Sequence, residues 1–282
     1  MAAHFLAVDG GGSGSRFLLV AADGTHRIER GAANVFSDFD GSVAVLTDGL
    51  SALEATSGVS LIRVPACLAL AGAIDEATCA RVAAALLLSR VVVEEDWRAA
   101  LDGALDGADG TLAGIGTGSF LARRQGAEAW AIGGHGAVLG DEASGAWIGR
   151  QLLSRTLHAA EGLVPGSPLA DATLAEFGGI PGIVAFARTA TAEAFAALAP
   201  RVAAAGGDPL GHAILTDGAA YLHRAAAALG WQPGEPFCLS GGLAGTYAPR
   251  LAAPLAEARV APKGGALDGA LARARRLAET GA

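Results

Sequence analysis

The stretch 7-AVDGGGSGSRFLLV-20 constrains the fold most, because four of the five residues from Gly10 to Gly14 are glycines and lie between two apolar runs. A dinucleotide-binding loop requires a helix directly after its glycines, so that the helix N-terminus faces the pyrophosphate. The next residues here, 17-FLLV-20, favour a strand instead. We therefore predict a β-hairpin with the glycines at its tip. Its strands are expected at 4–9 and 16–22, followed by a tight turn at 23–25.

The same arrangement returns in 112-LAGIGTGSFLARR-124, which reads as a strand, a glycine tip with a hydroxyl, and a second strand. Two such hairpins, about one small domain apart, predict two related halves that face each other across a cleft. A third glycine cluster, 240-SGGLAG-245, comes after a strand-like segment at 236–242 and opens a helix. Apolar patterning predicts further strands at 61–70 and 90–95, and helices at 41–57, 75–88, 142–159, 168–177, 191–204, 208–229, 246–257 and 266–279. The chain is therefore expected to form mixed α/β layers.

Composition narrows the class of protein. The 282 residues suffice for two modest domains, and 52% apolar with 17% charged residues indicates a packed globular chain. The net charge of −8, without any basic run, argues against nucleic-acid binding. The longest apolar run, residues 82–93, contains Arg90 and is too short to span a bilayer, so no membrane association is expected. Three isolated cysteines and the lack of a signal-peptide pattern predict a cytoplasmic protein.

The glycine tips are candidate phosphate-binding loops. Where no Cβ atoms intervene, backbone N–H groups and one hydroxyl can surround phosphate oxygens. A single loop of this kind is equally well a sharp turn built from small residues. The two copies, Gly10 to Ser13 and Gly116 to Ser119, favour the phosphate-binding interpretation. The third cluster could flatten against a nucleobase and ribose.

Acidic residues at element ends are candidate catalytic or metal-binding groups. Asp9 ends the first strand just before the glycines, where it could hold a hydrated Mg²⁺. Asp96 ends the predicted strand 91-VVVEED-96, and Asp141 precedes a predicted helix. Taken singly, each of these two is more often a helix cap than a catalyst. His135 by itself is more often structural, and the sequence carries neither zinc-type histidine spacing nor a serine-hydrolase motif.

In this order, the three glycine stations resemble the phosphate 1, phosphate 2 and adenosine motifs of the superfamily of sugar kinases, Hsp70 and actin. The segment 134-GHGAVLGDEASGAWIG-149 is similar to the BadF/BadG/BcrA/BcrD ATPase-like branch, which contains N-acetylglucosamine kinase and bacterial glucosamine kinase. Further matching segments are 31-GAANVF-36, 68-LALAGA-73, 206-GGDPL-210 and 262-PKGGALDGAL-271.

This resemblance implies an α/β fold of two ribonuclease-H-like domains around a central cleft. The N-terminal actin-like ATPase domain is expected at 1–110 and the C-terminal one at 111–265. The last helix, within 266–282, is expected to pack on the N-terminal domain.

The resemblance also implies roles for individual residues. Asp96 matches the base that takes the proton from the sugar 6-hydroxyl, although it lies in 94-EEDWR-98 where relatives usually carry a T-D-A-like sequence. Asp9 matches the acid associated with Mg²⁺. Besides Asp96, the positions that contact the amino sugar match Asn34, Gly134, His135, Gly136 and Asp141. The positions that contact ATP match Gly10, Gly11, Gly12, Ser13, Gly116, Thr117, Gly118, Ser119, Gly241 and Gly242.

The implied activity is transfer of the γ-phosphate from Mg-ATP to the 6-hydroxyl of glucosamine or N-acetylglucosamine, by a homodimeric kinase. Ala71 stands where animal N-acetylglucosamine kinases carry a hydroxyl, so the acyl preference stays open, with a lean towards free glucosamine. Two alternatives also stay open: an ATPase subunit that drives a partner protein, and a non-catalytic module that binds nucleotide or sugar. The lack of a four-cysteine cluster excludes the iron–sulfur activators of this branch.

Overall fold

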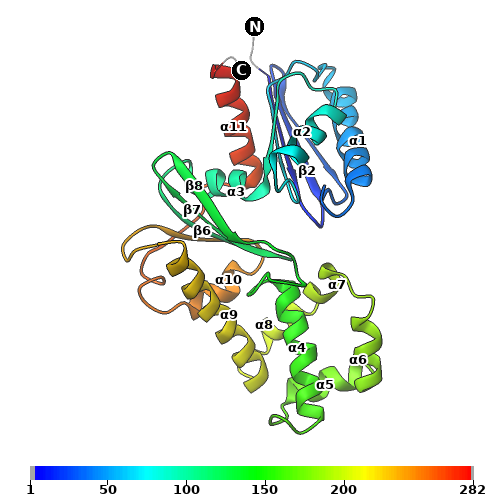
Figure 1. The fold of residues 1–282 in the computed structure, drawn as a ribbon, viewed down its shortest axis with the longest axis vertical. Coiled ribbons are helices and arrows are strands. Elements are labelled where there is room, and N and C mark those ends of the chain that lie inside the picture. The colour runs from blue at the N-terminus through cyan, green and yellow to red at the C-terminus, as the bar shows by residue number, and fades with distance from the viewer. Residues whose placement is uncertain (1–3, 281–282) are drawn as a thin grey trace. The chain divides into compact units, whose positions relative to one another are not determined.

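The computed structural model describes residues 4–280, and the chain forms two compact units (Figure 1). Unit 1 consists of Met1–Asp109, Arg124–Ala129 and Ala261–Ala282, and unit 2 consists of Gly110–Arg123 and Trp130–Val260. The chain therefore passes from one unit to the other four times. Each unit contains one five-stranded sheet with helices, in agreement with the predicted α/β class.

The sheet of unit 1 has the strand order β3-β2-β1-β4-β5. Its strands are β1 (Phe5–Gly10), β2 (Ser15–Ala21), β3 (Gly24–Arg30), β4 (Ala66–Leu70) and β5 (Val91–Glu95). β1, β2 and β3 form an antiparallel meander, whereas β1, β4 and β5 are parallel. The register aligns Gly10 with Leu70, and Leu70 with Glu95, so the three parallel strands end in one row. The glycine loop and Asp96 both come directly after this row.

Two strands of unit 1 differ from the sequence-based prediction. β3 was not predicted, because its sequence GTHRIER contains one large apolar residue, Ile28, and it forms an edge strand in which no residue is fully buried. β4 begins at Ala66 rather than at residue 61. Pro65, which has no N–H to donate, precedes it, and its carbonyl accepts from the backbone N–H of Leu6 at 3.0 Å.

Helices cover both faces of this sheet. Figure 1 shows α1 (Phe39–Ser57) and α2 (Glu76–Ala85) on one face, and α3 (Asp96–Leu105) and α11 (Ala266–Thr280) on the other. Side chains alternate along each strand. Leu6, Val8, Leu68 and Leu70 therefore belong to the core under α1 and α2, whereas the smaller Ala7, Cys67 and Ala69 pack with α3 and α11.

α3 and α11 approach each other through glycines. A Cβ atom on Gly103 would lie 1.9 Å from the carbonyl oxygen of Gly265, and one on Gly269 would lie 1.9 Å from that of Ala99. Both separations are far below van der Waals contact, so only glycine permits this crossing. Just before α11, the N–H of Lys263 donates to the carbonyl of Ala104 at the end of α3. The two helices are thus joined along their length.

Unit 2 has the strand order β10-β9-β6-β7-β8. Its strands are β6 (Gly110–Ile115), β7 (Ser119–Gln125), β8 (Glu128–Gly133), β9 (Phe237–Ser240) and β10 (Arg259–Val260). Its helices are α4 (Gly145–Ala160), α5 (Pro168–Glu176), α6 (Ile180–Ala187), α7 (Ala192–Ala196), α8 (Ala199–Ala204), α9 (Pro209–Ala228) and α10 (Ala244–Tyr247), with a 3₁₀ turn at Ala248–Arg250. β6, β9 and β10 are parallel, and α4 and α9 supply much of the apolar core.

In unit 2, prolines explain why two observed helices differ from the predicted ones. The helix predicted at 191–204 is instead two helices, α7 and α8, and Pro200 lies in the first turn of the second. The helix predicted at 246–257 ends early, as α10 and a 3₁₀ turn that contains Pro249. β8, β10 and α6 were not predicted from the sequence.

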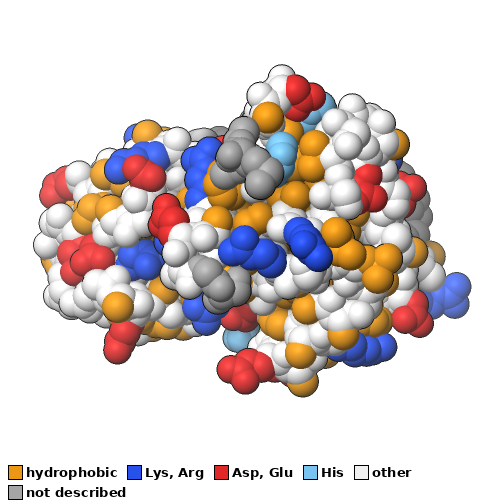
Figure 2. Space-filling view, turned by 90° about the horizontal axis from the view of Figure 1, so that it is seen from above, with side chains coloured by type: hydrophobic (Ala, Val, Ile, Leu, Met, Phe, Trp, Pro, Cys, Tyr) orange, Lys and Arg blue, Asp and Glu red, His pale blue; other side chains and the backbone are white. Residues whose placement is uncertain are grey.

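The surface carries charges of both signs. On the face drawn in Figure 2, the Lys and Arg side chains of the described residues are interspersed with acidic, apolar and neutral groups. Between residues 4 and 280, no single helix has the length and apolar character needed to cross a membrane. The bent pair α5–α6 meets that test by length and composition when its two helices are counted together.

We predict that Gly103→Ala destabilises the protein by about 1–3 kcal/mol, since the added methyl group must push α3 away from α11. Urea unfolding of both proteins measures this difference. Gly31→Ala is the matched control, because a Cβ atom there would have no neighbour within 4 Å, and its effect should stay within about 0.5 kcal/mol. Equal stability of the two variants would contradict the close helix crossing.

Candidate functional site

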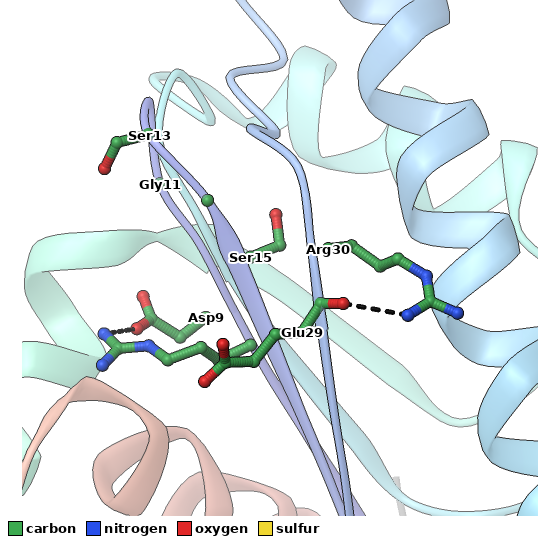
Figure 3. Close-up of a pocket in the computed structure, with 8 residues that line it drawn as sticks. Asp9, Gly11, Ser13, Ser15, Glu29 and Arg30 are labelled. Atoms are coloured by element: carbon green, nitrogen blue, oxygen red, sulfur yellow. Dashed lines mark hydrogen bonds and ion pairs between the residues drawn. The ribbon is translucent and has the colours of Figure 1, made fainter. Parts of the chain in front are cut away.

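The glycine loop of unit 1 forms the tip of the hairpin between β1 and β2. The N–H of Gly11 donates to the carbonyl of Gly14 at 2.9 Å, and the N–H of Ala33 donates to the carbonyl of Gly11 at 3.0 Å. Ser13 is exposed at the tip. Figure 3 shows the pocket beside this loop, whose lining residues are Asp9, Gly11, Ser13, Gly14, Ser15, Arg16, Glu29 and Arg30. Small residues and exposed backbone thus border a polar pocket, as the phosphate-loop interpretation expects.

Asp9 and Arg16 form a cross-strand ion pair in this pocket (Figure 3). They are direct partners in the β1–β2 register, one residue outside the closed tip on each strand. Asp9 is 8% exposed, whereas the side chain of Arg16 is 60% exposed. Arg16 is a residue of this pocket that was not predicted from the sequence. Counting outwards from the glycine tip along both strands would have found it, because cross-strand partners are fixed by hairpin register.

Asp96 is the first residue of α3 and comes directly after β5. The sequence also allowed Asp96 to be a helix cap, and the structure does not support that role. The N-cap position is Glu95, and no side-chain capping hydrogen bond is formed there. Burial, followed by the nearby Asp9 carboxylate, raises the pKa of Asp96 from 3.8 to about 6. Unit 1 therefore brings two of the predicted acids, Asp9 and Asp96, into electrostatic contact.

Asn34 lies beside the start of the glycine loop. Its Oδ1 accepts hydrogen bonds from the N–H groups of Phe36 and Ser37, both at 3.1 Å. Asn34 also forms a β-bridge with Ala71, whose N–H donates to the carbonyl of Gly10 at 2.7 Å. The Nδ2 group of Asn34 donates to no group among the described residues, so it is available to a ligand.

The second glycine loop, in unit 2, is held by the start of α4. Gly145 and Ala146 donate their N–H groups to the carbonyls of Gly116 and Thr117, at 2.8 and 3.1 Å. The third glycine station adjoins the same loop, because the N–H of Leu243 donates to the carbonyl of Ile115 at 3.1 Å. Gly241 packs so closely there that a Cβ atom would lie 2.3 Å from that carbonyl oxygen. Unit 2 thus brings the predicted phosphate 2 and adenosine residues together, since Gly242 is the next residue in the chain.

Asp141 joins this loop to the turn that contains Gly134, His135 and Gly136. It is 6% exposed, and its carboxylate accepts from the N–H of Gly136 at 3.2 Å. Its Oδ2 lies so close to Gly118 that a Cβ atom there would be 2.7 Å away. Burial raises the pKa of Asp141, while the backbone N–H groups of Gly136 and Ser119 lower it in part. Asp141 therefore holds the turn at Gly134–Gly136, which is predicted to contact the sugar, against the glycine loop at Gly116–Gly118.

Ser119 and His135, two other predicted site residues, differ in whether their side chains are free to bind a ligand. The hydroxyl of Ser119 is buried and donates to the carbonyl of Glu142 at 2.6 Å, so its proton is already used within unit 2. His135 is exposed on the turn, as are Gly134 and Gly136. The turn also exposes Val138 and Leu139. Among the unit 2 residues predicted to contact the sugar, Gly134, His135 and Gly136 are therefore accessible to a ligand, whereas Asp141 is buried.

The donor set fits a magnesium–nucleotide rather than a protein-enclosed metal ion. No group of three metal-ligating side chains occurs within residues 4–280. Mg²⁺ is usually held by one or two carboxylates together with phosphate oxygens and water. Asp9, at the end of β1 beside the glycine loop, offers such a carboxylate. The residues present therefore fit Mg²⁺ only when a phosphate ligand accompanies it.

Comparisons with protein families, with single proteins and with solved structures point to the same group of relatives. The BadF/BadG/BcrA/BcrD ATPase family model matches residues 6–257. The glucosamine kinase GspK of Vibrio cholerae serotype O1 is 28% identical over 277 residues, which cover 95% of this chain and 94% of that protein.

Solved structures agree. A putative N-acetylglucosamine kinase from Chromobacterium violaceum superposes with a TM-score of 0.87 at 30% identity, covering 96% of this chain and 99% of that one. A ROK family glucokinase from Streptomyces griseus, solved with glucose and AMPPNP, has the same fold, with a TM-score of 0.58 at 17% identity over 97% of this chain and 99% of that one. The predicted two-domain sugar-kinase fold class is confirmed.

We predict that Asp96→Asn stabilises the folded protein by about 1–3 kcal/mol at pH 7. The pKa of Asp96 is about 6 in the folded state against 3.8 for an unperturbed side chain, so the folded protein binds more protons between these values. The ionised side chain therefore opposes folding fully above pH 6 and not at all below pH 3.8. Denaturant unfolding of both proteins should show a higher free energy of unfolding for Asp96→Asn at pH 7.5 and no difference at pH 3.5.

Asp75→Asn is the control, because Asp75 is a true N-cap of α2 whose side chain accepts from the N–H of Thr78, which lowers its pKa. That variant should show no gain at pH 7.5. A destabilised Asp96→Asn protein at this pH would contradict the raised pKa.

Proposed function

The chain belongs to the BadF/BadG/BcrA/BcrD ATPase family, and on that premise we propose that it is an ATP-dependent amino-sugar kinase. The reaction transfers the γ-phosphate of ATP to the 6-hydroxyl of glucosamine or N-acetylglucosamine. One observation supports this most directly: a partly buried carboxylate, Asp96, lies in electrostatic contact with Asp9 beside a glycine loop. This arrangement combines a proton acceptor with a phosphate-binding loop.

Asp96 is the proposed base. A base must be ionised at the working pH and must also accept a proton readily, which requires a pKa not far below that pH. Burial and Asp9 raise the pKa of Asp96 to about 6, so at neutral pH the side chain is mostly ionised and is a better proton acceptor than an ordinary aspartate. Its place at the first turn of α3 aims it from a rigid element.

The phosphates are the proposed ligands of the glycine loops. Phosphoryl transfer depends mainly on positioning and on neutralising charge. In unit 1 the N–H groups of the Gly10–Gly14 tip, the hydroxyl of Ser13 and the guanidinium of Arg16 supply donors. In unit 2 the loop at Gly116–Gly118 does the same. Mg²⁺, held by Asp9, would neutralise phosphate charge when bound.

The sugar is the proposed ligand of Asn34 and of the Gly134–Gly136 turn. The Nδ2 group of Asn34 has no acceptor among the described residues, and His135 is exposed. Asp141 acts in this proposal mainly by holding the turn, since its carboxylate already accepts from backbone N–H groups. We lean towards glucosamine over N-acetylglucosamine, because the 71-AGA-73 segment next to Asn34 offers no side-chain hydroxyl.

We further propose that the kinase requires Mg²⁺ and works as a homodimer in the cytoplasm. The donor chemistry of Asp9 supports the first statement. The three free cysteines, two of them buried, are compatible with a reducing compartment. Light scattering of the purified protein measures the oligomeric state.

A second candidate is an ATPase that drives a partner protein, because the family description itself names ATPases. A module that binds nucleotide without turnover is the third. ADP release measured with and without sugar separates all three.

We predict that ADP release requires both Mg²⁺ and an amino sugar. In a panel of hexoses, glucosamine and N-acetylglucosamine should be turned over and glucose should be much poorer, because the half-buried Asn34 amide and the exposed His135 turn are polar groups suited to the amino substituent. Equal kcat/KM for glucose and glucosamine would refute the amino-sugar assignment. Turnover that ignores sugar would favour the partner-driving ATPase.

We predict that Asp96→Asn lowers kcat by about 10²–10⁴-fold, the usual contribution of a general base. In the wild type, kcat/KM should fall about tenfold per pH unit below pH 6, because the base becomes protonated there. Glu95→Gln, at the same junction, is the control and should retain most of its activity. Retention of more than about a tenth of wild-type kcat by a well-folded Asp96→Asn protein would assign the base elsewhere.

A further inference from the structure

The position of Asp96 is set by the junction of two elements. β5 ends at Glu95, and α3 begins at Asp96 without a side-chain cap at its N-terminus. The angle between the strand and the helix therefore decides where the Asp96 carboxylate lies. A helix start that lacks a capping hydrogen bond needs another restraint if the junction is to be rigid.

A buried charge cluster lies behind this junction. Glu94, on β5, is 8% exposed, and Asp102, on α3, is 3% exposed. Arg273, on α11, contacts both: its Nη1 donates to Oε2 of Glu94 at 2.6 Å, and its Nε lies 2.9 Å from Oδ2 of Asp102. One guanidinium thus joins the element before Asp96 to the element that Asp96 begins.

Two further arginines complete the cluster but do not bridge it. Arg276, also on α11, pairs with Oδ2 of Asp102, and Arg124 pairs with its Oδ1. Neither has an ion pair with Glu94 among the described residues. Asp102 therefore keeps two cationic partners without Arg273, whereas Glu94 keeps none within ion-pair distance between residues 4 and 280. Arg276 provides an internal comparison for Arg273 on the same helix.

Resting on the proposed kinase function, we propose that Arg273 is a positioning residue that fixes the Asp96 carboxylate for proton transfer, by clamping Glu94 of β5 to Asp102 of α3. Stability alone does not explain such a cluster, because buried ion pairs are often no more stabilising than apolar packing of the same volume. Arginine suits the task, because different nitrogens of its planar guanidinium reach the two carboxylates, whereas a single lysine ammonium cannot span both in this way.

The test compares Arg273→Met, Arg273→Lys and Arg276→Met for kcat, for the KM of ATP and sugar, and for hydrogen exchange of residues 94–99. Arg273→Met should lower kcat about 10- to 100-fold, the scale expected for a displaced catalytic group, with each KM changed by less than about twofold. Exchange at 94–99 should become faster. Arg273→Lys should behave like Arg273→Met, whereas Arg276→Met should keep kcat within about twofold of wild type.

Arg273→Met leaves Glu94 buried without its partner, so the double variant Glu94→Gln/Arg273→Met removes that charge and secures a folded protein. Its kcat should stay as low as that of Arg273→Met. Wild-type kcat in the double variant would mean that the unpaired Glu94 charge caused the defect, and it would overturn the clamp. Equal kcat losses in Arg273→Met and Arg276→Met, or full activity of Arg273→Lys, would overturn it as well.

These outcomes are distinct from failure of the proposed function. If the wild-type protein shows no sugar-dependent ADP release, both the kinase assignment and the clamp fall. If the wild-type protein turns over sugar and Arg273→Met matches it, only the clamp falls.

Discussion

The in-register ends of three parallel strands are the constraint on which unit 1 depends. Gly10, Leu70 and Glu95 occupy equivalent positions on β1, β4 and β5, so the three segments that follow these strands begin at the same end of the sheet. Each strand leads into a different segment: a glycine loop after β1, the 71-AGA-73 turn after β4, and Asp96 after β5. Carboxyl ends of parallel strands are where open α/β sheets bind their ligands. Register, rather than any single side chain, therefore gathers the candidate site.

The acidic side chains at these strand ends lower the stability of the folded protein. Burial and, second, the nearby Asp9 carboxylate raise the pKa of Asp96, and of these two acids only Asp9 has an arginine partner, Arg16, among the described residues. Behind them, Glu94 and Asp102 are buried but are offset by arginines. The buried carboxylates behind the site, Glu94 and Asp102, are thus paired with arginines. The carboxylate proposed to act on the substrate lacks an ion-pair partner among the described residues, which keeps it a better proton acceptor.

Much of this could be predicted from the sequence where local pattern decides structure. The glycine tip between two apolar runs predicted the β1–β2 hairpin, and the order of three glycine stations predicted the fold class. Local pattern failed at β3, whose exposed edge position leaves little apolar signal. It also failed at Asp96, because the strand–helix boundary decides between a cap and a first-turn residue. Arg273 was beyond reach: it pairs with a residue 179 positions earlier, and only the packing of α11 on α3 brings them together.

The glycine crossing of α3 and α11 has a consequence for the order in which the chain can fold during synthesis. One face of the first sheet is covered by α11, which supplies Leu267, Ala270 and Ala274 to that core. Residues 1–109 therefore leave the ribosome with this face covered by α3 but not yet by α11, and the residues of unit 2 are synthesised in the interval. Domains usually fold in the order of translation. Here the residues of unit 2 are all synthesised before α11, so this face of the N-terminal sheet gains its full cover only when the last helix has been made.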